Sequence, residues 1–147
     1  MTQAWIRAAM SLAILLGGAL PAAAQEDRPV RGWLNWRGPQ QNGTSMEKGL
    51  PEKATELWSI AHPGRGTPVI ADGRVYSWGY RGEKQDLREV LACLEEATGK
   101  TLWEHTFRDF FSDVVYDRYS IGSPTVDPDT GNVYLLTSPG LLLCFAP

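Results

Sequence analysis

The sequence predicts an all-β fold of repeated four-stranded antiparallel sheets, because three of its stretches return later in the chain. The pairs are residues 66–76 with 122–134, residues 90–94 with 141–145, and residues 56–58 with 101–103. Successive copies are offset by about 45 to 58 residues, and each unit is filled with short apolar runs and turns. Such a period is typical of the blades of a β-propeller. We therefore expect an incomplete propeller of about two blades.

The first 24 residues have the layout of a secretory signal peptide. A weakly basic start (1–7) precedes an apolar run of 13 residues (8–20) and a small-residue cleavage site (21–24). A helix that spans a membrane needs about 20 apolar residues, so a signal peptide is favoured over the alternative, an N-terminal membrane anchor. We therefore expect an exported protein, periplasmic or extracellular, with no membrane span after signal cleavage.

The composition and the cysteine positions argue against a nucleic-acid partner and against a disulfide. The chain has 14 Lys and Arg against 17 Asp and Glu, with no basic patch of the kind that binds nucleic acid, so no nucleic-acid partner is expected. Cys93 and Cys144 fall at equivalent places in successive units. Equivalent strands of packed sheets lie about 10 Å apart, whereas a disulfide needs Cα atoms within about 7 Å. Two buried thiols are therefore favoured over a disulfide.

Residues 25–55 are rich in Gly, Pro, Asn and Gln without a sustained period, which predicts an irregular arm anchored by Trp33 and Trp36. Within it, Asn42-Gly43-Thr44 matches a glycosylation acceptor, although an ordinary turn is favoured. From residue 56 onward, short β-type runs alternate with turns. Strands are expected at 57–60, 67–70, 74–78, 89–94, 101–106, 123–126, 133–137 and 141–145.

Proline and glycine mark the boundaries of these strands. Pro68 and Pro124 stand at strand starts, where a missing N–H costs least. Three glycines stand where turns need positive φ, namely Gly73, Gly99 and Gly131. Residues 79–86 are polar and predict a hairpin connection, with its solvated tip at 84–88. No segment after the signal peptide has a convincing helical period, so no helix is expected there.

These elements divide the chain into a closing strand, 56–61, one full blade, 66–107, and an incomplete three-stranded blade, 120–147. The closing strand carries the signature of a unit's fourth strand, and we expect it to complete the last blade of a ring. Propellers need about four to eight blades, so the sequence is expected to be the N-terminal piece of a longer protein.

The stretch from Cys93 to Trp103 resembles the tryptophan-docking motif of pyrroloquinoline-quinone-type propellers. Cys93 takes the motif's small position and Glu95 its acidic one, followed by Thr98, Gly99 and Trp103, although Glu95 departs from the usual Asp. The resemblance covers about residues 33–145. It implies quinoprotein-like blades in which the motif tryptophan stacks beside the motif of the next blade. Structural roles are therefore expected for Glu95, Thr98, Gly99 and Trp103.

Two functions follow from this resemblance. The favoured one is a non-catalytic scaffold that binds a protein or carbohydrate ligand. The alternative is the N-terminal part of a pyrroloquinoline-quinone (PQQ)-dependent alcohol or sugar dehydrogenase, for which PQQ and calcium would be the cofactors. Many such enzymes carry adjacent cysteines, and this sequence has none. Because one fold hosts many functions, no catalytic, cofactor-binding or metal-binding residue is assigned in this segment.

Candidate ligand-binding residues lie in the links between blades, which gather on one face of a propeller. They are His62, Arg65, Asp113, Asp117, Arg118 and Tyr119. We expect the two arginines to bind an anionic group and Asp117 to act as a base or a cation ligand. The favoured alternative is a packed loop whose aromatic rings bury and whose charges pair locally.

Overall fold

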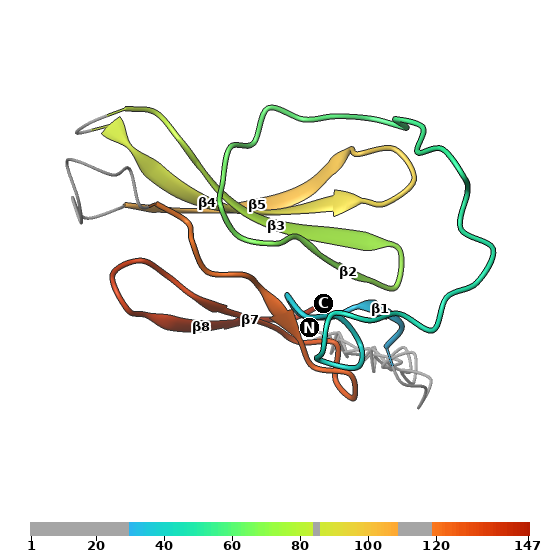
Figure 1. Ribbon diagram of the computed structural model, residues 1–147. Helices are drawn as coiled ribbons and strands as arrows, with labels where there is room; N and C mark the ends of the chain where they lie inside the picture. Colours follow the sequence, from blue (N-terminus) through green and yellow to red (C-terminus); the bar gives the residue numbers. More distant parts are fainter. Residues whose placement is uncertain (1–29, 84–85, 109–118) are drawn as a thin grey trace, which may run out of the picture.

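The computed structural model describes residues 30–83, 86–108 and 119–147, which form two antiparallel sheets (Figure 1). In the first sheet β1 (Gly32–Trp33), β2 (Val69–Ala71), β3 (Arg74–Arg81), β4 (Arg88–Glu95) and β5 (Thr101–Arg108) follow in order. The second holds β6 (Thr125–Val126), β7 (Val133–Leu136) and β8 (Leu142–Phe145). The all-β prediction is confirmed, and this part of the chain contains no helix that could span a membrane.

The two sheets lie face to face, with β3, β4 and β5 above the three-stranded sheet in Figure 1. In β7, Val133 and Leu135 are buried against the first sheet while Tyr134 and Leu136 point outward, the period-2 alternation of a half-buried strand. In the first sheet, β4 is buried on both faces from Glu89 to Leu94. The apolar run of β4 therefore forms the centre of the molecule.

The hairpin between β3 and β4 is longer than the sequence predicts. Cross-strand pairing continues beyond Trp78↔Leu91 to Arg81↔Arg88, so the strand expected to end at residue 78 continues to Arg81. The polar side chains near the tip are compatible with a strand because Arg81 finds an ionic partner on β5, Glu104. Polar composition alone therefore placed the end of the strand too early.

The N-terminal arm is less irregular than expected. β1 pairs with β2 through Gly32↔Ala71 and Trp33↔Ile70, and Gly32 adopts φ 141°. A Cβ on Gly32 would lie 2.0 Å from the Ile70 carbonyl oxygen, so only glycine fits this approach. Trp33 packs against Gly38. Trp36 is 64% exposed, so the prediction that it anchors the arm is wrong.

Two further expectations need correction. Residues 57–60 form no strand, because no neighbouring strand is present to hydrogen-bond with them among the described residues. Cys93 and Cys144 are free thiols, as expected, and Cys93 is buried. Cys144 is exposed, because it lies on the outward face of β8 opposite Tyr134.

Candidate functional site

The segment that leads into β2 lies beside the described end of the link that leads into β6. The backbone N–H groups of Arg65 and Gly66 both donate to the carbonyl oxygen of Ser120, at 3.3 and 3.1 Å. One residue further on, the Thr67 N–H donates to Ser123 Oγ at 2.8 Å. These bonds join the segment before β2 to the segment before β6. The described ends of the two links therefore meet at one end of the sheets.

His62 is held against β3 within the segment before β2. Its Nε2 lies 3.2 Å from the Ser77 carbonyl oxygen, and its ring covers Gly79, where a Cβ would approach Nε2 to 2.7 Å. Burial lowers the pKa of His62, so the neutral ring is favoured and Nε2–H donates to Ser77. Its Nδ1 is buried without a hydrogen-bond partner among the described residues. His62 therefore packs as a neutral ring.

An ion pair lies close enough to influence His62. Arg81 donates two hydrogen bonds to the carboxylate of Glu104, at 2.7 and 2.5 Å. This pairing lowers the pKa of Glu104 and raises that of Arg81. The two charges act on the pKa of His62 in opposite directions, so burial remains the main cause of its shift.

Glu89 is a buried acidic residue that the sequence analysis did not single out. Its carboxylate is inaccessible to solvent and accepts hydrogen bonds from Ser120 N at 2.9 Å, from Ser138 N at 3.2 Å and from Ser138 Oγ. The hydroxyl of Ser120 has one proton. It donates this proton to Gly79 O at 2.7 Å, because this contact is shorter than the one to Glu89 at 3.2 Å. Glu89 thus ties β4 to the link before β6 and to the β7–β8 turn.

The structure brings together three of the six predicted loop residues. His62, Arg65 and Tyr119 belong to the paired links. Tyr119 is only 6% exposed and its ring meets Tyr80 edge-on with centroids 5.7 Å apart, so it packs under the surface. Asp113, Asp117 and Arg118 lie outside the described residues.

The residues of the tryptophan motif lie at the opposite end of β4 and β5. Thr98 Oγ1 donates to the carboxylate of Glu95, and Gly99 N donates to Glu95 O at 2.8 Å, which closes the turn. The indole of Trp58 covers this turn, where a Cβ on Gly99 would lie 2.5 Å from the ring. Trp58 Nε1 also donates to Glu96 O at 2.8 Å. On the other face of the sheet, Trp103 stacks on Phe145 with centroids 6.0 Å apart.

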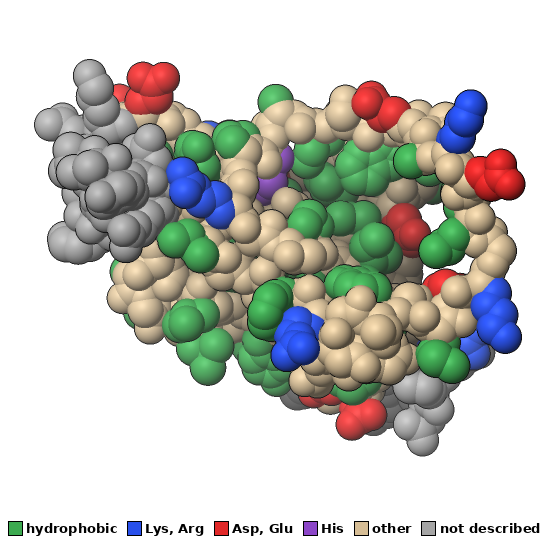
Figure 2. All heavy atoms as spheres, in the orientation of Figure 1, with side chains coloured by type: hydrophobic (Ala, Val, Ile, Leu, Met, Phe, Trp, Pro, Cys, Tyr) green, Lys and Arg blue, Asp and Glu red, His purple; other side chains and the backbone are tan. Residues whose placement is uncertain are grey.

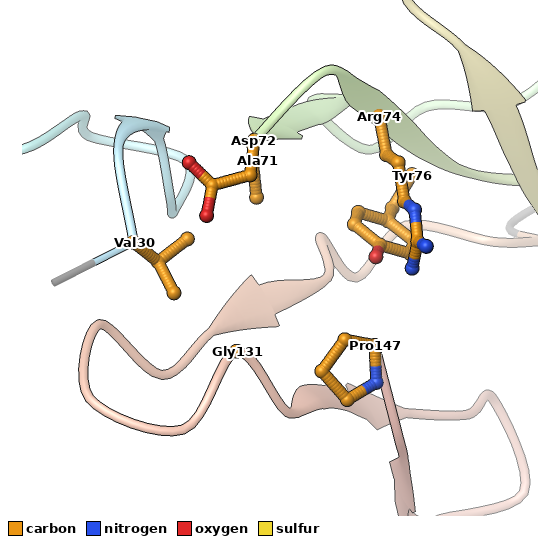
Figure 3. A pocket seen from close by; sticks show the side chains of 7 residues that line it. All are labelled: Val30, Ala71, Asp72, Arg74, Tyr76, Gly131 and Pro147. Carbon is orange, nitrogen blue, oxygen red and sulfur yellow. The ribbon is translucent and has the colours of Figure 1, made fainter. Parts of the chain in front are cut away.

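A small pocket of about 170 Å³ opens where the β2–β3 turn meets the second sheet (Figure 3). It is lined by Val30, Ala71, Asp72, Arg74, Tyr76, Gly131 and Pro147. Burial raises the pKa of Tyr76, so its hydroxyl stays protonated at neutral pH. One guanidinium and one phenol make this pocket suited to a small polar molecule. It lies at the start of β3, whereas the links meet β3 at its far end.

The acidic, histidine and cysteine side chains do not cluster within the described ranges. No group of three or more His, Cys, Asp or Glu side chains there could hold a metal ion. Carboxylate and amide oxygens are the ligands that calcium prefers, and Asp113 and Asp117 fall outside these ranges.

No protein-family model, curated protein or solved structure matches the chain.

Proposed function

We propose that the chain is an exported, non-catalytic binding module built from stacked blades of the PQQ-like propeller type. Its ligand, a protein or a carbohydrate, would bind at the surface around Arg65, where the segment before β2 meets the segment before β6. The observation that carries this proposal is the equivalent packing of two tryptophans, Trp58 and Trp103, against successive sheets.

This equivalence follows from the repeat. Trp58 packs on a cluster that contains Val75 and Leu94 of the first sheet. Trp103 packs on the cluster of Val133 and Phe145 in the second sheet. In the sequence repeat, Val75 corresponds to Val133 and Leu94 to Phe145. Both tryptophans thus meet equivalent positions, which supports stacked units of one kind.

The polar groups near the links favour binding over catalysis. Glu89 is used as an acceptor for the link and the β7–β8 turn, and burial holds His62 as a neutral ring. A general acid or base needs a group within reach of a substrate, and Glu89 is inaccessible to solvent. By contrast, Arg65 is exposed on a backbone fixed by Ser120, a rigid placement suited to recognition.

The test measures binding of the chain to an array of oligosaccharides and an array of peptides. We expect at least one saturable ligand whose affinity falls about tenfold or more in Arg65→Ala, the loss of one charge-assisted contact. Arg37→Ala is the matched control, because Arg37 is exposed on the arm over Trp36 and should leave the affinity unchanged. Equal losses in both variants, or no ligand at all, would contradict the proposal.

A separate titration addresses the dehydrogenase alternative. The chain is mixed with PQQ and calcium, and tryptophan fluorescence and alcohol- or sugar-dependent reduction of a dye are recorded. A binding module gives no saturable quenching and no dye reduction. Stoichiometric quenching accompanied by dye reduction would establish the alternative in place of our proposal.

A further inference from the structure

The hairpin of β3 and β4 extends further than its counterpart in the second sheet. β3 and β4 have 8 residues each, whereas β7 and β8 have 4 each. In the repeat, Val75 corresponds to Val133 and Leu91 to Leu142. Residues 79–81 and 88–90 therefore have no strand counterpart in the described part of the second sheet. Insertions in one repeat often form the binding face of a repeat protein, so this extension is a candidate for ligand recognition.

Three arginines form one row across the extension. Arg81 pairs with Arg88, and Arg88 pairs with Arg108 on β5. Directly paired residues of antiparallel strands lie on the same face of the sheet, and neighbouring strands are about 5 Å apart. We call Arg81, Arg88 and Arg108 the arginine row. Like charges directly opposite each other destabilise a sheet, so the row lowers the stability of the fold unless negative charge lies on it.

One carboxylate already lies on the arginine row. Arg81 reaches across β4 and donates two hydrogen bonds to Glu104 on β5, at 2.7 and 2.5 Å. The side chain of Arg81 is 51% exposed and that of Glu104 is 23% exposed. The fork of a guanidinium matches the two oxygens of a carboxylate. This surface therefore accepts a carboxylate while it stays open to solvent.

The arginine row lies beyond the apolar body of the same face. There Val75, Ala92 and Leu94 pack with Trp58, and Figure 2 shows hydrophobic side chains gathered in this hollow. An apolar neighbour that suits the body of the face would not suit the row, because burying charge without an ionic partner is costly. The row therefore calls for an anionic partner, whatever packs on the body of the face.

The arginine row continues the surface around Arg65. Tyr80 N donates to Pro63 O at 2.8 Å, which places the segment before β2 along β3, next to Arg81. The ring of His62 covers Gly79 on the same strand. Four arginines thus gather at one end of the sheets, although the whole chain has 14 Lys and Arg against 17 Asp and Glu. The basic character of this end is local.

We propose that the arginine row binds a polyuronate, a polysaccharide that carries one carboxylate on each sugar ring. The inference rests on the proposed function, because it names the ligand of that binding module. Neighbouring members of the row are about 5 Å apart, close to the advance per ring in a 1,4-linked sugar chain. An extended acidic peptide offers carboxylates on one face only at every second residue, about 6.8 Å apart. A sugar chain therefore matches the row better than a peptide does.

A nucleic acid is another regular polyanion, and the charge of the chain argues against it. Domains that bind nucleic acid are usually basic overall, whereas this chain has a formal net charge of −3. A polyuronate meets the row with one carboxylate per guanidinium, the pairing that Arg81 and Glu104 already show.

Calorimetric titration of the chain with an oligogalacturonate tests the proposal. We expect saturable binding that weakens about tenfold or more in Arg108→Gln, which loses one charge-assisted contact. Arg31→Gln is the matched control, because Arg31 is exposed at the other end of the sheet, where its carbonyl oxygen accepts from Asp72 N. This variant loses the same charge and should keep its affinity. No binding, or equal losses in both variants, would overturn the proposal.

Two further readouts separate recognition from a structural role. Arg108→Gln removes one of the opposed charges, so its free energy of unfolding should rise while its affinity falls. Glu104→Gln leaves Arg81 to the ligand and removes a carboxylate that repels it, so its affinity should rise. A destabilised Arg108→Gln chain, or weaker binding in Glu104→Gln, would contradict the proposed role of the row.

Other probes in the same titration identify the ligand class. A fully methyl-esterified oligogalacturonate of the same length has no charge and should not bind. A sulfated sugar chain of the same length, hexaglutamate and a single-stranded oligodeoxynucleotide should all bind more weakly than the uronate. Equal or tighter binding of any of these probes would overturn the assignment to a polyuronate.

Arg65→Ala distinguishes this inference from the proposed function. Uronate binding that depends on Arg65 but not on Arg108 would overturn the role of the arginine row and leave the proposed function standing. Uronate binding that depends on Arg108 but not on Arg65 would support the row and overturn the placement of the ligand around Arg65.

Discussion

Removing the carboxylate of Glu89 is expected to destabilise the fold strongly. Glu89→Ala leaves the N–H of Ser120, a residue with no solvent exposure, without its acceptor, and frees both donors of Ser138. An orphaned buried donor costs about 1–3 kcal/mol, and loss of the side chain adds a cavity. The expected loss is about 3–5 kcal/mol of unfolding free energy, a large part of the about 5–15 kcal/mol of a typical domain.

The assay is equilibrium unfolding in urea, followed by tryptophan fluorescence. Glu89→Gln keeps an amide oxygen for Ser120 but turns a donor toward one of its other partners, so a smaller loss of about 1–2 kcal/mol is expected. Ser138→Ala, which removes one hydroxyl donor on an exposed residue, should cost about 1 kcal/mol. A loss below about 1 kcal/mol for Glu89→Ala would refute the reasoning, because the orphaned donors would then have to be hydrated.

The remaining predictions concern His62 and the turn at Gly99. Because burial lowers the pKa of His62 below 6.5, the unfolded chain binds more protons just below that pH, and unfolding free energy should fall as pH drops from about 7 through this window. His62→Gln should flatten this dependence in urea titrations. Gly99 has φ +70° and touches the Trp58 ring, so Gly99→Ala should lower the melting temperature more than Gly73→Ala, where φ is +80° but the space is open. Equal shifts for the two glycine variants would argue against the contact with Trp58.

The sequence was sufficient to predict the strands whose partners lie close along the chain. The alternation of Val133 and Leu135 with Tyr134 and Leu136 identifies β7 and its buried face. The continuous apolar run of β4 identifies the central strand. Both patterns lie within one short segment of the sequence. Each of these strands also forms its hydrogen bonds with the strand that is its neighbour in a hairpin.

Where a partner depends on distant packing, the sequence was insufficient. Residues 57–60 have the composition of a strand, yet a strand forms only where a neighbour accepts its hydrogen bonds. The pairing of β1 requires the close approach of Gly32 to Ile70, which no periodicity signals. At the candidate site, one sequence feature could have identified Glu89: it is an acidic residue at the start of the apolar run that forms β4. Its hydroxyl partners come from segments 31 and 49 residues away.

The central claim is that Trp58 and Trp103 occupy equivalent places on successive sheets. Proton–proton nuclear Overhauser effects from the two indole rings test it most directly. We expect contacts from the Trp58 ring to the side chains of Val75 and Leu94, and from the Trp103 ring to those of Val133 and Phe145. A Trp58 ring without contacts to Val75 and Leu94, or a Trp103 ring that does not reach Val133 and Phe145, would contradict the account of two stacked repeat units.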